Sequence, residues 1–193
     1  MKQPKIVILF LISVFTRFAI GQICEASSGA HCYYLDPIHG DDLSNNGTFS
    51  KPWKTFSNIM SYYGGIYSSF LPPKWVLLRA GDRVYLRGGV YNHTLTPGSD
   101  AGATGGSRAI AYFRSWANGQ TSGTELNPIH LQSYPGEHAI IGDIADEPYG
   151  YGLLFYSNEY WNVHDIEFRD IPGDCIWLPG CGNSKLHNLF VHD

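Results

Sequence analysis

The chain has 193 residues, of which 44% are hydrophobic, 15% aromatic and 16% charged. That is long enough and apolar enough for one domain with its own core. The net charge is −4 at pH 7 without any basic run, so the charge pattern indicates neither a nucleic acid nor an anionic membrane surface as a partner.

The first 21 residues are predicted to be a secretory signal peptide. A basic start precedes a ten-residue apolar run at 6–15, and small residues precede a cleavage site at Gln22. The run is short for a membrane span, and an uncleaved membrane anchor is the alternative interpretation. We therefore expect a mature chain of residues 22–193 that is secreted, extracellular and free of membrane segments.

Secretion favours disulfide bonds between the four cysteines, which are Cys24, Cys32, Cys175 and Cys181. Four cysteines allow three pairings. The local pairing, Cys24 with Cys32 and Cys175 with Cys181, is the simplest of the three. The chain has no CxxC spacing, so the sequence gives no indication of a structural zinc site.

In chain order, a short first strand is predicted at 32–37, followed by a polar loop. This loop holds a glycosylation sequon at Asn46, and a second sequon stands at Asn92. Both asparagines are expected to carry glycans in a secreted protein, with unmodified side chains as the alternative. Apolar residues then recur with helical spacing and predict an amphipathic α-helix over 54–63.

After Gly81 the hydrophobic period changes to two, which indicates short strands separated by frequent turns. Segment 99–127 is rich in Gly, Ser and Ala and is expected to be a long loop. No further helix is predicted, which excludes folds of alternating strands and helices. An antiparallel sandwich or barrel and a β-helix both remain compatible with this pattern.

An internal repeat distinguishes between these two folds. Residues 163–170, "VHDIEFRD", recur 23 positions later at 186–193 as "LHNLFVHD". Val163 and Ile166 are both apolar but three apart, so they would face opposite sides of a straight strand. A bend at His164-Asp165 brings both inside, and the second copy has the same slip at His187-Asn188. Coils stacked in parallel would repeat such a bend in register, so the sequence predicts a β-helix.

Three segments carry a family resemblance: "DPIHGDDLSNNGTFSKPWKTF", "AGDRVYLRGGVYN" and "SGTELNPIHLQSYPGEHAIIGD". Together they resemble the N-terminal part of secreted right-handed parallel β-helix proteins of the pectate-lyase-like superfamily. The resemblance implies an all-β, right-handed parallel β-helix with an N-terminal capping helix near 54–63. An insertion at 64–79 departs from the family pattern.

In the resembled lyases, acidic residues on one sheet hold calcium beside the uronate of the substrate. A Lys or Arg then removes a proton, and the glycosidic bond breaks by β-elimination. No position of this chain matches a catalytic motif of the family, so none is assigned. The resemblance implies calcium as the cofactor and an acidic polysaccharide as the partner.

The repeat itself places Asp170 and Asp193 at the same position of adjacent coils, about 4.8 Å apart. Two such carboxylates repel unless they are exposed, protonated or bridged by a cation. Turn residues in water are the ordinary interpretation of this pair; one edge of a calcium or sugar site, and a glycosidase pair, are the functional alternatives. The nearby basic candidates are Arg169 and Lys185.

Two further sets of residues are candidates for binding. His164 and His187 are expected to stack, either as a metal-binding pair or as solvated turn residues. The rings of Trp161, Trp177 and Tyr160 are suited to stacking on sugars, with structural packing as the alternative.

The function expected from the sequence is that of a secreted carbohydrate-active protein, possessing uronan lyase activity if it is an enzyme. A non-catalytic glycan-binding or structural β-helix protein is the alternative. Leu186, Leu189 and Val191 should face inward on the final coil, with no capping segment after them. We therefore expect a fragment that is incomplete at its C-terminus and that self-associates through its last coil.

Overall fold

The computed structural model describes residues 23–62, 71–94, 108–115, 122–147 and 150–193; the predicted signal peptide lies outside them. Within these ranges the chain forms strands and one short 3-10 helix: β1 (Cys32–Leu35), η1 (Phe56–Asn58), β2 (Arg83–Leu86), β3 (Gly89–Tyr91), β4 (Arg108–Arg114), β5 (Ile129–Ser133), β6 (Ala139–Gly142), β7 (Gly150–Tyr156), β8 (Trp161–Arg169), β9 (Ile176–Trp177) and β10 (Lys185–His192).

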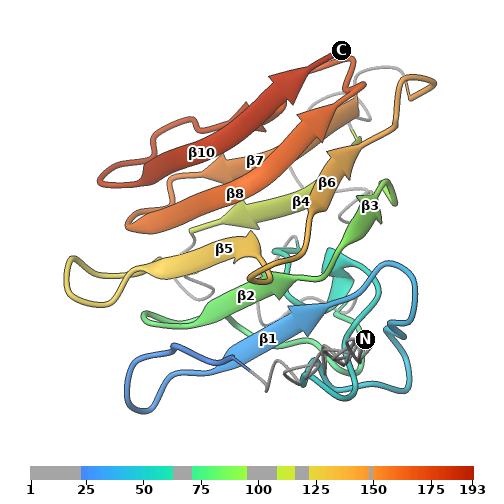
Figure 1. Ribbon diagram of the computed structural model, residues 1–193. Helices are drawn as coiled ribbons and strands as arrows, with labels where there is room; N and C mark the ends of the chain where they lie inside the picture. The colour runs from blue at the N-terminus through green and yellow to red at the C-terminus, as the bar shows by residue number, and fades with distance from the viewer. Residues whose placement is uncertain (1–22, 63–70, 95–107, 116–121, 148–149) are drawn as a thin grey trace, which may run out of the picture.

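All the strand pairs are parallel, and they build two sheets (Figure 1). The larger sheet contains β1, β2, β5, β8, β10, β6 and β3, and the smaller one contains β4, β7 and β9. The first half of β8 pairs with β5 and its second half pairs with β6. The chain therefore winds in stacked coils through both sheets. This confirms the β-helix-like parallel solenoid and excludes the antiparallel alternatives for the described residues.

The predicted 23-residue repeat is the register between the last two long strands. Val163 pairs with Leu186, and Ile166 pairs with Leu189. Asp165 has φ 58° and Asn188 has φ 52°. This left-handed backbone occurs at the predicted bend in both copies and turns Val163 and Ile166 inward, where they are 0% and 1% exposed.

The final strand, β10, places its predicted inward residues as expected, opposite buried residues of β8. Leu186, Leu189 and Val191 pair with Val163, Ile166 and Phe168. Leu186 is nonetheless 41% exposed and Val191 60% exposed. Self-association through these residues stays a prediction.

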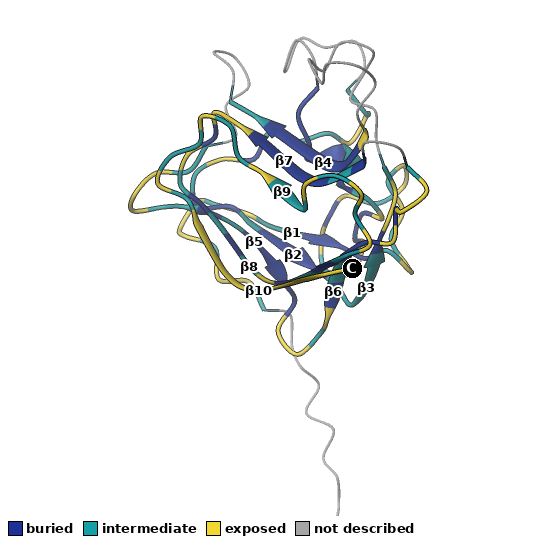
Figure 2. Cartoon of the chain, turned by 90° about the horizontal axis from the view of Figure 1, so that it is seen from above, coloured by how far each residue is buried: buried dark blue, intermediate teal, exposed yellow. Residues whose placement is uncertain are grey.

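The two sheets face each other, as Figure 2 shows from above, and buried side chains from both belong to one core cluster. Its centre is aromatic: the rings of Phe113 and Phe155 stack 5.2 Å apart, and Trp161 lies 4.7 Å from the first and 4.9 Å from the second. Because these three residues come from β4, β7 and β8, their packing ties the smaller sheet to the larger one. Strand β4 falls within segment 99–127, so the prediction of a continuous loop there was wrong.

The α-helix predicted over 54–63 is absent from the described part of that segment, which forms only the single turn η1. The amide of Ser61 donates to the carbonyl of Tyr112, and the amide of Val76 donates to the carbonyl of Asn58. Backbone groups that an α-helix would pair internally are thus used in tertiary contacts. The predicted apolar stripe is nevertheless buried, at Phe56, Ile59 and Met60. Within the described ranges, no helix has the length and apolar character that a membrane span requires.

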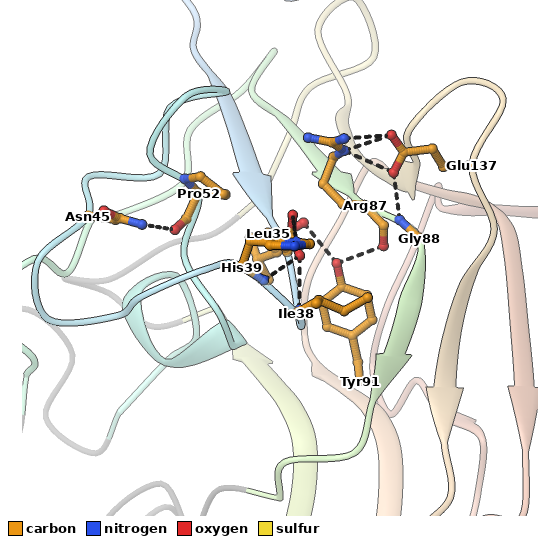
Figure 3. Close-up of polar contacts among 10 residues, drawn as sticks. Leu35, Ile38, His39, Asn45, Pro52, Arg87, Gly88, Tyr91 and Glu137 are labelled. Carbon is orange, nitrogen blue, oxygen red and sulfur yellow. Dashed lines mark hydrogen bonds and ion pairs between the residues drawn. The ribbon is translucent and has the colours of Figure 1, made fainter.

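A polar corner joins successive coils where β2 runs into β3 (Figure 3). The guanidinium of Arg87 binds the carboxylate of Glu137 with contacts of 2.8 and 2.9 Å, and this carboxylate also accepts from the amide of Gly88 at 2.7 Å. The buried hydroxyl of Tyr91 lies 2.8 Å from the carbonyl oxygen of Leu35 and 3.0 Å from that of Arg87. These bonds connect the turn between β2 and β3 to the coils on either side of it.

The cysteines behave differently at the two ends of the chain. Cys24 and Cys32 form the predicted disulfide bond. Cys175 and Cys181 are free, so the second half of the local pairing was wrong. The extended strand β9 separates these two residues along the smaller sheet, and the thiol of Cys181 lies against the carbonyl oxygen of Phe155 at 3.5 Å. Burial raises the pKa of both thiols.

Candidate functional site

The outer face of the smaller sheet carries a group of aromatic side chains, which we call the aromatic patch: Tyr151, Tyr156 and Trp177. The ring of Trp177 lies 6.3 Å from that of Tyr151 and 6.4 Å from that of Tyr156. Trp177 is 43% exposed and Tyr156 is 39% exposed. Large aromatic side chains are usually well buried, so this grouping offers ring faces to a ligand.

A cation borders the aromatic patch. Arg114 on β4 pairs with Tyr156 on β7, and its guanidinium carbon lies 4.9 Å from the centre of that ring. This is a cation–π contact, which places the charged group over the face of the ring. The patch therefore combines apolar ring faces with a positive charge that is suited to a carboxylate.

The rest of this outer face is covered by the segment inserted after the predicted helix. Leu71 and Trp75 pack on a buried cluster whose members are Met60, Tyr62, Ala109, Tyr112 and Leu154. The indole nitrogen of Trp75 donates to the carbonyl of Met60 at 2.7 Å. The described end of the 64–79 insertion therefore covers part of the smaller sheet, where Tyr151 also packs on this cluster, while Tyr156 and Trp177 stay exposed.

Only one of the three aromatic residues proposed from the sequence belongs to the patch. Trp177 is part of it, whereas Trp161 is 1% exposed and lies in the core, in line with the packing alternative. Tyr160 lines a polar hollow of about 490 Å³ at another turn. Strand alternation in "GYGLLFYS" places Tyr156 on the face opposite Phe155, so the sequence itself carries a signal for the exposure of Tyr156.

Asp170 and Asp193 come together as predicted. They follow the paired residues Arg169 and His192, and both line one hollow of about 210 Å³. Both side chains are exposed. Among the described residues, no group of three or more His, Cys, Asp or Glu side chains is arranged to hold a metal ion. Calcium binding by this pair stays a prediction.

The basic candidates beside the repeat differ in their surroundings. Arg169 forms two hydrogen bonds to the carboxylate of Asp143, at 2.7 and 2.9 Å, and also lies 3.5 Å from Glu167. These bonds raise the pKa of Arg169 and lower that of Asp143. Arg169 therefore serves in an ion-pair network. Lys185 is exposed and lines the same polar hollow as Tyr160.

Both glycosylation sequons lie on the surface. The side chains of Asn46 and Asn92 are exposed. The hydroxyl of Thr48 donates to the amide oxygen of Asn46 at 2.9 Å, so the two polar groups of that sequon face each other. Modification of either asparagine stays a prediction.

Comparison with known proteins supports the fold. No family model matches the sequence, and no curated protein matches it. Among solved structures, the chain is similar to a rhamnogalacturonan lyase, with a TM-score of 0.55 and 21% identity over 85% of this chain and 36% of that one. It is also similar to a GH136 lacto-N-biosidase from Eubacterium ramulus, with a TM-score of 0.50 and 21% identity over 84% of this chain and 27% of that one.

The chain thus spans about a third of the length of these two carbohydrate-active enzymes. A sequence identity of 21% indicates a similar fold. A functional site has to be inferred from the residues of this chain. What the comparisons establish is that this coil of parallel strands is an architecture that carbohydrate-active enzymes also use.

Proposed function

We propose that this protein is a secreted carbohydrate-active β-helix protein that binds a polysaccharide chain on its aromatic patch. The observation that carries the proposal is the pair of exposed rings, Tyr156 and Trp177, whose centres lie 6.4 Å apart with an angle of 64° between their planes. A sugar ring has an apolar face that packs well against an aromatic ring. The two structural neighbours support the choice of ligand class because both are named for activities on carbohydrates.

The proposed ligand is an acidic polysaccharide. Arg114 holds a permanent positive charge against the ring of Tyr156, within reach of a carboxylate on a sugar stacked there. The hollow of Asp170 and Asp193 adds a place for calcium, a hard cation that takes carboxylate oxygens as ligands. If the whole protein is an enzyme, calcium-assisted β-elimination is the proposed reaction. A glycan-binding protein without catalysis is the alternative.

Secretion and the handedness of the coil belong to the same proposal. The disulfide between Cys24 and Cys32 supports an oxidising compartment, which the predicted signal peptide would reach. Connections between parallel strands of one sheet are right-handed in nearly all proteins, which supports a right-handed coil here.

Binding to a panel of uronans and neutral polysaccharides tests the ligand. We expect the purified protein to bind a uronan, and Trp177→Ala and Tyr156→Ala to weaken this binding about tenfold or more, since each removes a stacking surface. Arg114→Gln should weaken binding to uronans while sparing neutral chains. Phe190→Ala is the matched control, because Phe190 is an exposed aromatic residue on the larger sheet. Equal binding by all four variants would sink the proposal.

A second assay addresses catalysis separately. The formation of unsaturated sugar products is followed spectroscopically, with calcium and with chelator. Product that depends on calcium would support the lyase, and uronan binding without product would support the glycan-binding alternative.

A further inference from the structure

Two histidines lie against each other on the outer face of the larger sheet, on strands remote from the aromatic patch. His164 on β8 pairs with His187 on β10 in the parallel register. Their rings are 4.6 Å apart with an angle of 8° between their planes. Residues next to them on each strand, Val163 and Leu186, take the inward positions, so both imidazoles point outward.

A carboxylate fixes one of these imidazoles. Nδ1 of His164 lies 2.6 Å from Oδ2 of Asp165, and the other oxygen of this carboxylate accepts from the side-chain amide of Asn188 at 3.1 Å. A carboxylate that accepts from one ring nitrogen leaves the other nitrogen with its lone pair, which is the arrangement that supports metal-bound histidines in many proteins. The bend thus supplies an oriented imidazole with a negative charge behind it.

We propose that His164 and His187 form a binding site for a first-row transition-metal ion such as Zn²⁺ or Cu²⁺. Imidazole nitrogens are preferred ligands of these ions. A ring nitrogen binds zinc at about 2.0–2.1 Å, so two rings on one tetrahedral ion have centres roughly 5 Å apart. The observed separation of 4.6 Å is close to that value.

Binding requires one adjustment of the ligand-free arrangement. Two rings that share an ion cannot remain parallel, because each must point a nitrogen at the same place. His187 is exposed and can rotate about its terminal side-chain torsion, whereas His164 is held by Asp165. The ring of His130 on β5 lies 5.8 Å from that of His164, but among the described residues no group of three such side chains is arranged to hold a metal ion. Water therefore occupies the other ligand positions, and the ion stays accessible.

Titration of the purified protein with Zn²⁺ and with Cu²⁺, followed by calorimetry, tests the site. We expect one equivalent to bind, and His164→Ala and His187→Ala each to weaken binding about tenfold or more. Asp165→Asn keeps a residue that tolerates the left-handed backbone and should weaken binding about tenfold through loss of the supporting carboxylate. The matched control is His39→Ala, because exposed His39 also has a nearby carboxylate, Asp36 at 3.5 Å.

Electron paramagnetic resonance of the Cu²⁺ form identifies the ligands independently of affinity. Two coordinated imidazole nitrogens, reduced to one in His187→Ala, would support the site. A spectrum dominated by sulfur would assign the metal to the free thiols of Cys175 or Cys181 and overturn the proposal. Unchanged affinity of His187→Ala for the metal ion would also overturn the proposal. Because His187 is exposed on the last strand, this variant should fold, which circular dichroism checks.

Discussion

Asp165 and Asn188 adopt the same left-handed backbone on neighbouring strands, and the amide of Asn188 donates to the carboxylate of Asp165 at 3.1 Å. The bend of each coil therefore rests on the bend of the next. Side chains that branch at Cβ resist this conformation, whereas Asn, Asp and Gly accept it.

The bend makes a first prediction about stability. Asp165→Val should lower the free energy of unfolding by roughly 1–3 kcal/mol, because it forces a β-branched residue into a left-handed backbone. Asp165→Gly is the control: it loses the same carboxylate but accepts the backbone. Denaturant unfolding of the two variants separates the contributions. Equal losses in both would mean that the side-chain contacts, and not the backbone, hold the bend.

The second prediction compares a buried tryptophan, which should matter for stability, with an exposed one, which should matter for binding. Trp161 is 1% exposed among the core aromatics, so Trp161→Ala should destabilise the fold by about 3–5 kcal/mol. Trp177→Ala, on the exposed patch, should change stability by less than about 1 kcal/mol while reducing uronan binding. Thermal melts and binding assays on both variants test this. A large loss of stability in Trp177→Ala would make its ring a structural element.

The ion pair of Asp143 and Arg169 predicts a dependence on pH. The hydrogen bonds from Arg169 lower the pKa of Asp143 in the folded state. A carboxyl with a lowered folded pKa contributes stability above its unfolded pKa of about 3.9 and loses it as the pH falls through the folded value. Asp143→Asn should therefore be slightly less stable at neutral pH and flatter in its stability profile below about pH 4. A profile parallel to that of the wild type would refute this role.

Thiol counting tests the cysteine pattern. The structure has one disulfide and two free thiols. Alkylation in denaturant without reductant, followed by peptide mass spectrometry, should label Cys175 and Cys181 and leave Cys24 and Cys32 unlabelled. In the native state the labelling should be slow, because burial raises the pKa of both thiols and lowers their thiolate fraction. Absence of label in denaturant would restore the local pairing predicted from the sequence.

The sequence was informative wherever it repeats itself. The slip between Val163 and Ile166 predicted the bend, its place at His164-Asp165 and the parallel register, because a straight strand with a period of two cannot bury both side chains. Earlier coils gave no such signal. Arg83 pairs with His130, which pairs with Asn162, which pairs with Lys185, so successive spacings are 47, 32 and 23 residues. No two of these spacings are equal, so the similarity of 163–170 to 186–193 is the one repeat that the sequence analysis found.

Other features depended on contacts that no local pattern records. The apolar spacing at 54–63 correctly marked buried residues but not their conformation, because Tyr112 and Val76 supply hydrogen bonds from distant parts of the chain. The sequence predicted only part of the aromatic patch. Trp177 was a candidate, but its neighbour Tyr156 is brought next to it only by the pairing of β7 with β9.

The unequal coil spacings have a consequence for how such a molecule can change. The strands of the larger sheet keep their register from the longest coil to the shortest. The connections that lead into β4 and β7, and those that lead out of them, differ in length. Insertions there cost little, since loop closure grows only slowly with length. The stacked strands and the loops around the aromatic patch can therefore vary independently. Exchanging these loops can change ligand specificity without disturbing the stacking of the coils.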